Sequence, residues 1–179
     1  MTQLDLSILD WIQTHLRCDF LDRVVPWITA LGEFGAIWIL LALVLLISPR
    51  TRKLGLAVAF ALVLDLIFCN VIIKPLVARP RPFTLRPEIE LLIQAPKDFS
   101  FPSGHTAASF AAAGALFFSK NRGWIPALIL ALAIAFTRLY LYVHFPSDVI
   151  CGALLGILCG AAGAVLMKKS CNFYKARRI

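Results

Sequence analysis

A histidine, an aspartate and an arginine lie close together in the segment TRLYLYVHFPSD, which covers residues 137–148. His144 and Asp148 are four residues apart, and Pro146 suits the first turn of a helix. A carboxylate near a histidine fixes the imidazole tautomer, raises its basicity and stabilises the imidazolium. Arg138 falls inside an apolar run, where a charge is costly unless it pairs or faces a wet cavity. The segment therefore indicates acid–base or nucleophilic chemistry, although a helix cap beside an interfacial histidine would use the same residues.

A second candidate site is the segment FSFPSGHTAASF at residues 99–110. Ser103 is a favourable N-cap, which places Gly104 and His105 in the first turn of the following helix. Exposed backbone N–H groups and the positive end of the helix dipole favour a bound anion there, and glycine lets a ligand approach the backbone. An ordinary helix cap with an interfacial histidine is the alternative.

The third candidate site is KPLVARPRP at residues 74–82, where prolines predict an extended segment that presents Lys74, Arg79 and Arg81. These cations could hold an anion, or they could anchor the chain by contacting lipid headgroups. Asn70 lies four residues before Lys74, so both share a helix face; support of Lys74 and simple interhelical packing both remain open. Asp65 lies in the middle of an apolar run and has either a functional or a structural role.

The elements that position these residues are apolar helices. The chain has 179 residues, of which 60% are hydrophobic and 16% charged, and its net charge is +8. A soluble domain carries about 25% charged residues, so the composition favours an integral membrane protein and disfavours a disordered chain, a disulfide scaffold or a basic nucleic-acid binder. The five cysteines are widely spaced and form no metal-binding or redox motif.

The hydropathy pattern predicts an all-α bundle with about five membrane spans, since a span needs about 20 mostly apolar residues. Glycine and alanine are dense in the third and fifth spans, which we expect to pack closely at the centre. The expected spans cover residues 27–47, 54–73, 106–118, 125–142 and 149–167.

The N-terminal region has apolar residues at spacings of three and four, which predicts an amphipathic helix. It lies either in the membrane interface or against the end of the bundle. We therefore expect a single domain over 1–179, divided into an interfacial N-terminal helix at 1–25, a catalytic bundle at 26–167 and a basic tail at 168–179.

The distribution of basic residues predicts the orientation. The segments 48–53, 119–124 and 168–179 contain lysine and arginine but no acidic residue, which indicates the cytoplasmic side. The N-terminus would then lie outside and the C-terminus in the cytoplasm of a cell whose plasma or inner membrane holds the protein. Under this topology all three candidate sites meet on the extracytoplasmic face.

The three segments together resemble the signature of the type 2 phosphatidic acid phosphatases, the membrane branch of the superfamily that includes the vanadium haloperoxidases. The matching patterns are Lys74-x6-Arg81-Pro82, then Pro102-Ser103-Gly104-His105, then Thr137-Arg138-x5-His144-x3-Asp148. The resemblance spans about residues 70–152. This chain has Thr137 where the family commonly has serine. Relatives often have six spans, and with five expected here we expect the first of the six to be missing.

The resemblance implies a metal-independent phosphatase that needs no cofactor and acts through a phosphohistidine. His144 would be the nucleophile, Asp148 would orient it, and His105 would protonate the leaving group and then activate water. Phosphate would be bound by Lys74, Arg81, Ser103, Gly104 and Arg138, with Asn70 in support. Three cations would supply the charge stabilisation that phosphoryl transfer needs.

A site at the outer membrane surface suits a lipid phosphate or diphosphate, and the expected substrate is undecaprenyl diphosphate. Phosphatidylglycerophosphate, phosphatidic acid and lipid A phosphate are alternatives, as is phosphate transfer to an acceptor hydroxyl. A non-catalytic lipid-phosphate binder or transporter is the alternative of another class. It would need the cations, but not two histidines and an aspartate. Apart from substrate and membrane lipids, no partner is predicted, and nucleic acid is not expected.

Overall fold

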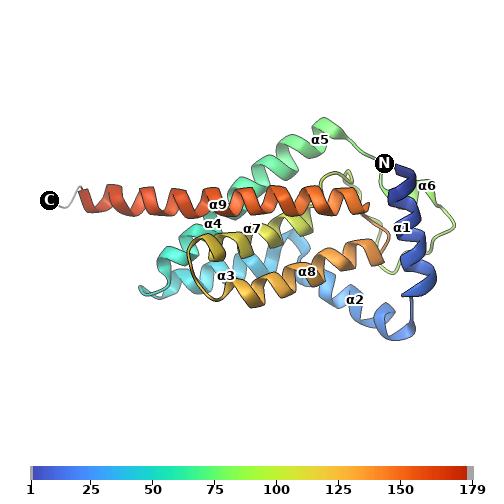
Figure 1. The fold of residues 1–179 in the computed structure, drawn as a ribbon, viewed down its shortest axis with the longest axis horizontal. Helices are drawn as coiled ribbons and strands as arrows, with labels where there is room; N and C mark the ends of the chain where they lie inside the picture. The colour runs from blue at the N-terminus through green and yellow to red at the C-terminus, as the bar shows by residue number, and fades with distance from the viewer. Residues whose placement is uncertain (1, 177–179) are drawn as a thin grey trace.

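The computed structural model describes residues 2–176, and their regular secondary structure is entirely helical (Figure 1). Most helices run along one long axis, while the N-terminal helix crosses one end of the bundle. The helices are α1 (Thr2–His15), α2 (Asp19–Leu31), η1 (Glu33–Gly35), α3 (Ala36–Ile47), α4 (Arg52–Asp65), η2 (Leu66–Ile73), α5 (Lys74–Val77), α6 (Pro82–Leu85), α7 (Gly104–Phe118), α8 (Trp124–Tyr140) and α9 (Pro146–Ala176).

Within the described residues, two helical stretches are long and apolar enough to cross a membrane, Arg52–Leu85 and Pro146–Asn172. A third qualifies if the bent pair Asp19–Leu31 and Glu33–Ile47 is taken as one span. The apolar helix Trp124–Tyr140 is shorter. The all-helical, membrane-spanning class predicted from composition is therefore confirmed, and the count of five spans stays a prediction.

The first predicted span, 27–47, is a broken helix pair. α2 and the helix that follows it meet at 42°. The break lies at Gly32, after which Phe34 and Gly35 adopt positive φ angles of 49° and 70°. A Cβ on Gly32 would lie 3.0 Å from Cδ2 of His105, so the missing side chain leaves room for that ring.

The second span continues further than predicted. η2 is a π-helix, and α5 follows it directly, so Lys74 is helical and the expectation of an extended segment from Lys74 is wrong. Pro75 is tolerated because it occupies the first turn of α5, where proline's fixed φ angle fits. The helix ends at Ala78, which has a φ of 47°, and the chain is extended at Arg81, just before α6.

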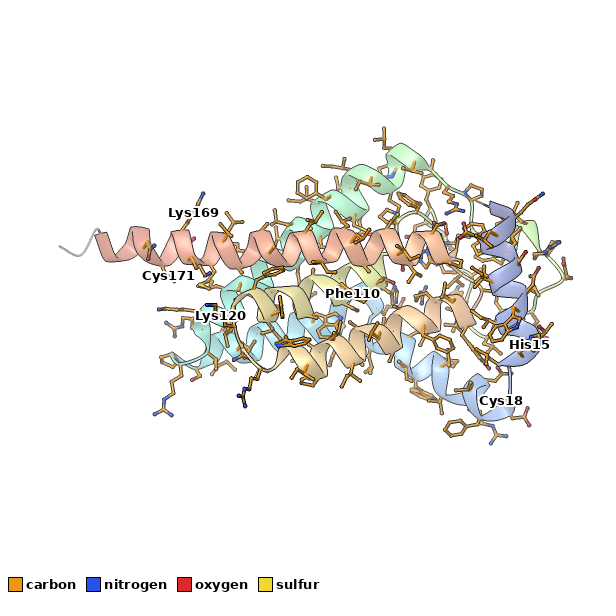
Figure 2. All side chains as sticks on the ribbon, in the orientation of Figure 1. His15, Cys18, Phe110, Lys120, Lys169 and Cys171 are labelled. Atoms are coloured by element: carbon orange, nitrogen blue, oxygen red, sulfur yellow. The ribbon has the colours of Figure 1, made fainter. Side chains whose placement is uncertain are left out.

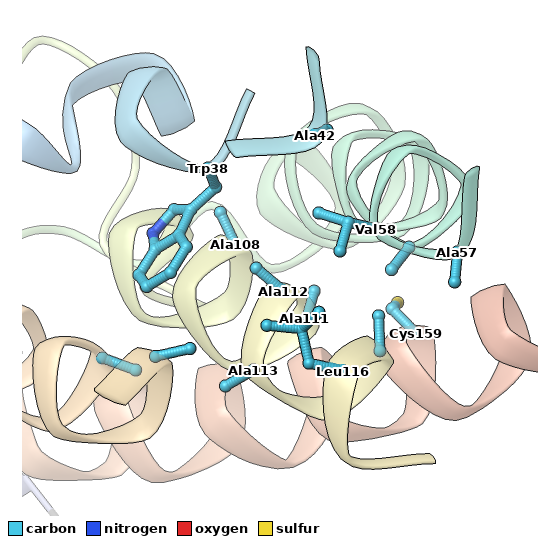
Figure 3. Packing of buried hydrophobic residues seen from close by; sticks show 14 of the residues in the cluster. Trp38, Ala42, Ala57, Val58, Ala108, Ala111, Ala112, Ala113, Leu116 and Cys159 are labelled. Carbon is cyan, nitrogen blue, oxygen red and sulfur yellow. The ribbon is translucent and has the colours of Figure 1, made fainter. Parts of the chain in front are cut away.

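Small residues bring α7 and α9 into close contact at the centre of the bundle, as predicted. A Cβ added to Gly160 would lie 2.7 Å from the backbone nitrogen of Ala115 and 2.8 Å from the backbone oxygen of Ala111. Figure 3 shows this core, in which Ala111 and its neighbours on α7 face α4 and Cys159 of α9. The close approach fixes the position of His105, which lies in the first turn of α7.

Replacing Gly160 by leucine should therefore destabilise the protein by about 3 kcal/mol, because the new side chain would clash with the backbone of α7, which is fixed by its own helical hydrogen bonds. Thermal unfolding in detergent measures the effect. Ala162→Leu is the matched control, since Ala162 lies exposed on the same helix. Equal unfolding temperatures for the two variants would contradict the proposed packing.

The N-terminal helix α1 packs on the end of the bundle and is shorter than the predicted 1–25, because α2 begins at Asp19; its place in the membrane interface stays a prediction. Leu9 and Ile12 are buried against the chain that joins α8 to α9, whereas Leu4, Ile8 and Trp11 are exposed. Figure 2 places His15 and Cys18 at this end, and Lys120 and Lys169 at the opposite end. The predicted tail at 168–179 is helical as far as Ala176, because α9 continues through it; residues 177–179 lie outside the described residues.

Candidate active site

The three candidate segments meet around one cavity of about 1110 Å³. Lys74 and Arg81 come from the end of the second span, Arg138 from the last turn of α8, and His144 from the loop that follows it. The residues predicted from sequence that line this cavity are Asn70, Lys74, Arg81, Gly104, His105, Arg138 and His144. The convergence predicted from topology is therefore present in the structure.

His144 is buried, and its two ring nitrogens lie in different environments. Its Nδ1 lies 3.6 Å from Oδ2 of Asp148, and its Nε2 lies 3.2 Å from a guanidinium nitrogen of Arg81. Burial lowers the pKa of His144 well below its usual value, and the charges of Arg81 and Arg138 lower it further. A neutral imidazole with Nδ1 facing a carboxylate leaves the Nε2 lone pair directed toward the cations, as a nucleophile requires.

Asp148 lies behind His144 and is fully buried. Its Oδ2 accepts hydrogen bonds from the Ser100 hydroxyl at 2.5 Å and the Phe145 backbone N–H at 2.9 Å. The Ser100 hydroxyl also lies 3.4 Å from Nδ1 of His144, so it stands between the two groups. These contacts hold the carboxylate on the Nδ1 side of the ring, away from the cavity.

His105 and Gly104 form the opposite wall. The His105 ring makes no hydrogen bond with another described residue and faces the cavity, so its nitrogens are available to a ligand. A Cβ on Gly104 would lie 3.2 Å from the Asn70 amide oxygen and 3.6 Å from the Lys74 ammonium nitrogen. The glycine therefore keeps space open beside a cation and an amide, as expected for a residue that a phosphate approaches.

An internal carboxylate bridges two of the cations. Asp98 pairs with the Lys74 ammonium through one oxygen and with Arg81 at 2.6 Å through the other. Burial alone raises the pKa of Asp98, but the hydrogen bond and charge of Lys74, with the charge of Arg81, lower it to about 2. Asp98 is therefore an anion bound by both cations at neutral pH, and a phosphate group would make the same kind of contacts with them.

Arg138 is the least satisfied of the three cations. It is 3% exposed, donates from one terminal nitrogen to the Thr29 hydroxyl at 2.5 Å, and has an Nε without a hydrogen-bond partner among the described residues. A buried donor without a partner is costly, and an arginine fork matches phosphate oxygens geometrically. Thr29 on α2 fixes one side of the guanidinium while the rest faces the cavity.

Two predicted hydroxyl groups turn away from the cavity. Ser103 occupies the N-cap position, but its hydroxyl bonds to that of Thr106 at 2.9 Å and makes no cap hydrogen bond. The predicted N-cap position and helix start are therefore confirmed, whereas the hydroxyl of the fully buried Ser103 has a side-chain partner instead of a backbone N–H. Thr137 likewise bonds back to the Ile134 carbonyl at 2.6 Å.

Sequence reasoning missed three contributors, Ser100, Asp98 and Thr29, and left Arg79 unassigned. Ser100 and Asp98 lie in an irregular loop and Thr29 in an apolar helix, so no periodic pattern marks them. The one available signal was the neighbouring signature FPSGH, which Asp98 and Ser100 closely precede. Asp65 lines the cavity deeper in the bundle, and its Oδ1 has no hydrogen-bond partner among the described residues.

The cavity changes character away from the cations. It continues along α3 and α4, where its walls are aliphatic. The apolar residues of this part include Ile39, Leu43, Leu46, Leu62 and Val63. Two of these side chains, Leu43 and Val63, are more than half exposed on the surface of the bundle. The cavity therefore joins a polar, cationic end to an apolar groove that opens between two helices.

A metal site is not evident in the part of the chain that the structure describes, where no group of three or more histidine, cysteine, aspartate or glutamate side chains is suitably gathered. The charge available to an anion in the cavity is that of Lys74, Arg81 and Arg138.

Comparisons with known proteins agree with this geometry. A family model described as the PAP2 superfamily matches residues 53–171. The chain is 38% identical over 129 residues to an undecaprenyl-diphosphatase of Sulfolobus acidocaldarius; the alignment covers 70% of this chain and 62% of that relative. This chain therefore matches less than two thirds of that relative's length.

Two solved structures are similar over most of the chain. The crystal structure of Aquifex aeolicus LpxE has a TM-score of 0.77 at 30% identity, with 89% of this chain and 94% of that chain covered. A transmembrane PAP2-type phosphatidylglycerolphosphate phosphatase from Bacillus subtilis has a TM-score of 0.73 at 26% identity, covering 96% of this chain and 86% of that one. The likeness thus extends over nearly the whole helical arrangement.

Proposed function

Because the chain belongs to the PAP2 superfamily, we propose that it is a membrane lipid phosphatase whose preferred substrate is undecaprenyl diphosphate. The observation that carries the proposal is the cavity itself, which joins two histidines and three cations to an apolar groove. A lipid phosphate has the same two parts, a charged headgroup and a hydrocarbon chain. The curated name of the Sulfolobus acidocaldarius relative supports the diphosphate over other lipids.

The first chemical step forms a phosphohistidine. Nε2 of His144 attacks phosphorus in line with the leaving oxygen, a P–N bond forms, and the bond from phosphorus to that oxygen breaks. The leaving oxygen takes a proton from His105. Lys74, Arg81 and Arg138 bind the non-bridging oxygens, and the backbone N–H groups at Gly104 and the start of α7 add to this charge stabilisation.

The second step releases inorganic phosphate. A water molecule gives a proton to His105 and bonds to phosphorus, while the P–N bond breaks and its electron pair returns to His144. The Asp98 carboxylate occupies Lys74 and Arg81 when the site is empty, so the substrate headgroup displaces it. The side chain of Asp98 is 52% exposed, which permits this movement toward solvent. No metal ion takes part in this scheme, because the three cations carry the charge.

The membrane arrangement completes the proposal. In this proposal the chain crosses the membrane five times, and the active site faces outward. The bent pair of α2 and the helix that follows it would form the first span. α1 lies in the outer interface, where its exposed residues Leu4, Ile8 and Trp11 contact lipid while Leu9 and Ile12 hold it to the bundle. The apolar groove along α3 and α4 then lies at a depth that the chain of a membrane-bound substrate can reach.

The experiment that tests the function is phosphate release from a panel of lipids by the purified protein in detergent, with EDTA present. We expect the highest kcat/KM with undecaprenyl diphosphate and lower values with phosphatidylglycerophosphate, phosphatidic acid and lipid A phosphate. A preference for phosphatidylglycerophosphate would move the assignment toward the Bacillus subtilis structural relative. Binding of these lipids without any release would indicate a binder, and loss of activity through EDTA alone would refute the metal-free scheme.

A further inference from the structure

The proposed catalytic pair of His144 and Asp148 is connected to the N-terminal helix by a chain of charges, in which Asp5 and Asp148 are buried and Arg79 is half-buried. One terminal nitrogen of Arg79 donates to Oδ1 of Asp148 at 2.5 Å, and the other donates to Oδ2 of Asp5 at 2.9 Å. Asp5 lies on α1 and is 6% exposed. The order Asp5, Arg79, Asp148, His144 therefore links a helix at the end of the bundle to the proposed nucleophile.

Asp5 also accepts two hydrogen bonds from Ser147 at the start of α9. Its Oδ1 accepts from the Ser147 backbone N–H at 3.1 Å, and its Oδ2 accepts from the Ser147 hydroxyl at 2.7 Å. Arg79 donates to the same hydroxyl at 2.8 Å and lies 3.9 Å above the Phe145 ring. All these contacts fall on Phe145 and Ser147, which lie between His144 and Asp148 where α9 begins, so they set the angle at which the carboxylate meets the imidazole.

The electrostatics make Arg79 more than a packing residue. Asp148 is fully buried, and a buried carboxylate needs a paired charge and hydrogen bonds. The imidazole of His144 faces Arg81 and has its pKa lowered, so it does not supply a positive charge in the resting site. Arg79 supplies it, on the carboxylate oxygen that faces away from His144.

We propose that Arg79 and Asp5 are positioning residues that hold the Asp148 carboxylate aimed at Nδ1 of His144, which makes α1 part of the catalytic apparatus. Neither residue is among those that line the cavity, so their effect passes through Asp148. The assignment rests on the proposed function, in which His144 is the nucleophile.

The test compares Arg79→Gln and Asp5→Asn with the control variant Asp10→Asn, which lies on α1 as Asp5 does. Asp10 on α1 pairs with Arg86 at 3.3 Å and accepts from the Tyr142 hydroxyl at 2.5 Å, but it does not contact Asp148. We expect Arg79→Gln to lower kcat by roughly 10- to 100-fold, the range typical of removing an outer hydrogen-bond partner, with KM close to the wild-type value. Asp5→Asn should lower kcat less, and Asp10→Asn should leave kcat unchanged.

Two further variants separate positioning from simple folding. Arg79→Lys keeps a charge on Asp148 but cannot bridge to Asp5, so it should recover part of the activity that Arg79→Gln loses. The double variant Asp5→Asn/Arg79→Gln should be no slower than Arg79→Gln alone, because both act through one carboxylate. Unchanged kcat in Arg79→Gln, an equal loss in Asp10→Asn, or a raised KM with normal kcat would overturn the proposal.

Failure of the proposed function has a separate signature. Rapid acid-free quenching of the wild type with labelled substrate should trap phosphate on His144. If the wild type turns over without this intermediate, the nucleophile assignment fails, whatever the Arg79 variants do. If the intermediate forms and Arg79→Gln makes it at the wild-type rate, only the positioning role fails.

Discussion

Replacing His144 by alanine should abolish phosphate release. The nucleophile divides one difficult displacement into two easier ones, and its loss leaves only a cavity that binds the headgroup. We expect kcat/KM to fall by roughly 10⁴-fold or more, about 5.5 kcal/mol of transition-state stabilisation. Steady-state assays with the preferred lipid measure the fall, and trapping with labelled substrate should find no phosphate on the protein.

Substrate binding provides the control for this variant. Lys74, Arg81 and Arg138 remain in His144→Ala, and the imidazole contributes no charge to them when neutral. We therefore expect lipid phosphate to bind nearly as tightly to the variant as to the wild type. A variant that retained wild-type turnover would refute His144 as nucleophile, whereas lost binding and lost folding together would show only that the buried ring is structural.

The features that could be predicted from sequence are those that a long pattern or a short, fixed spacing encodes. An apolar stretch such as 54–73 has few alternatives to a membrane helix, because lipid leaves no partner for unpaired backbone groups. The four-residue spacing of His144 and Asp148 around Pro146 predicted that they lie close together where the last helix begins, and the structure puts their side chains 3.6 Å apart. Topology then brought Lys74, Arg81 and Arg138 to the same end.

The features that sequence reasoning missed depend on tertiary contacts of single residues. The bend at Gly32 forms where the His105 ring needs space, which no pattern within 27–47 records. The π-helix before Lys74 has the same composition as an α-helix, so the extra helical turn was not expected. Asp98 is recognisable only once Lys74 and Arg81 flank it in space.

Arg79 illustrates the same limit within the site. Its place between two cations of the signature suggested that it binds either a phosphate or a lipid headgroup. In both roles the side chain would point away from the protein toward a ligand or lipid. The structure directs it inward to Asp5 and Asp148, which lie far from it in the sequence. An acidic residue in an amphipathic helix is ordinarily solvated, so the burial of Asp5 could not be anticipated from the pattern of residues 2–15.

His105→Ala should separate the two chemical steps, because His105 acts once as an acid and once as a base. An alkoxide leaving group, as in phosphatidylglycerophosphate, needs the proton, so its first step should slow by roughly 10²- to 10⁴-fold. A diphosphate or a nitrophenyl phosphate releases a stable anion, so its first step should be largely spared. Water activation is lost for every substrate, which makes hydrolysis of the phosphohistidine rate-limiting.

Stopped-flow assays with nitrophenyl phosphate measure this difference. His105→Ala should release a burst of nitrophenolate equal to the amount of enzyme, then turn over slowly while phosphate accumulates on His144. No burst should occur with phosphatidylglycerophosphate, because the intermediate barely forms. Equal losses for both leaving groups, without a burst, would mean that His105 binds phosphate instead of moving protons. The His105 ring faces the cavity without a hydrogen-bond partner among the described residues, so its nitrogens are free to exchange a proton with the leaving group and with water.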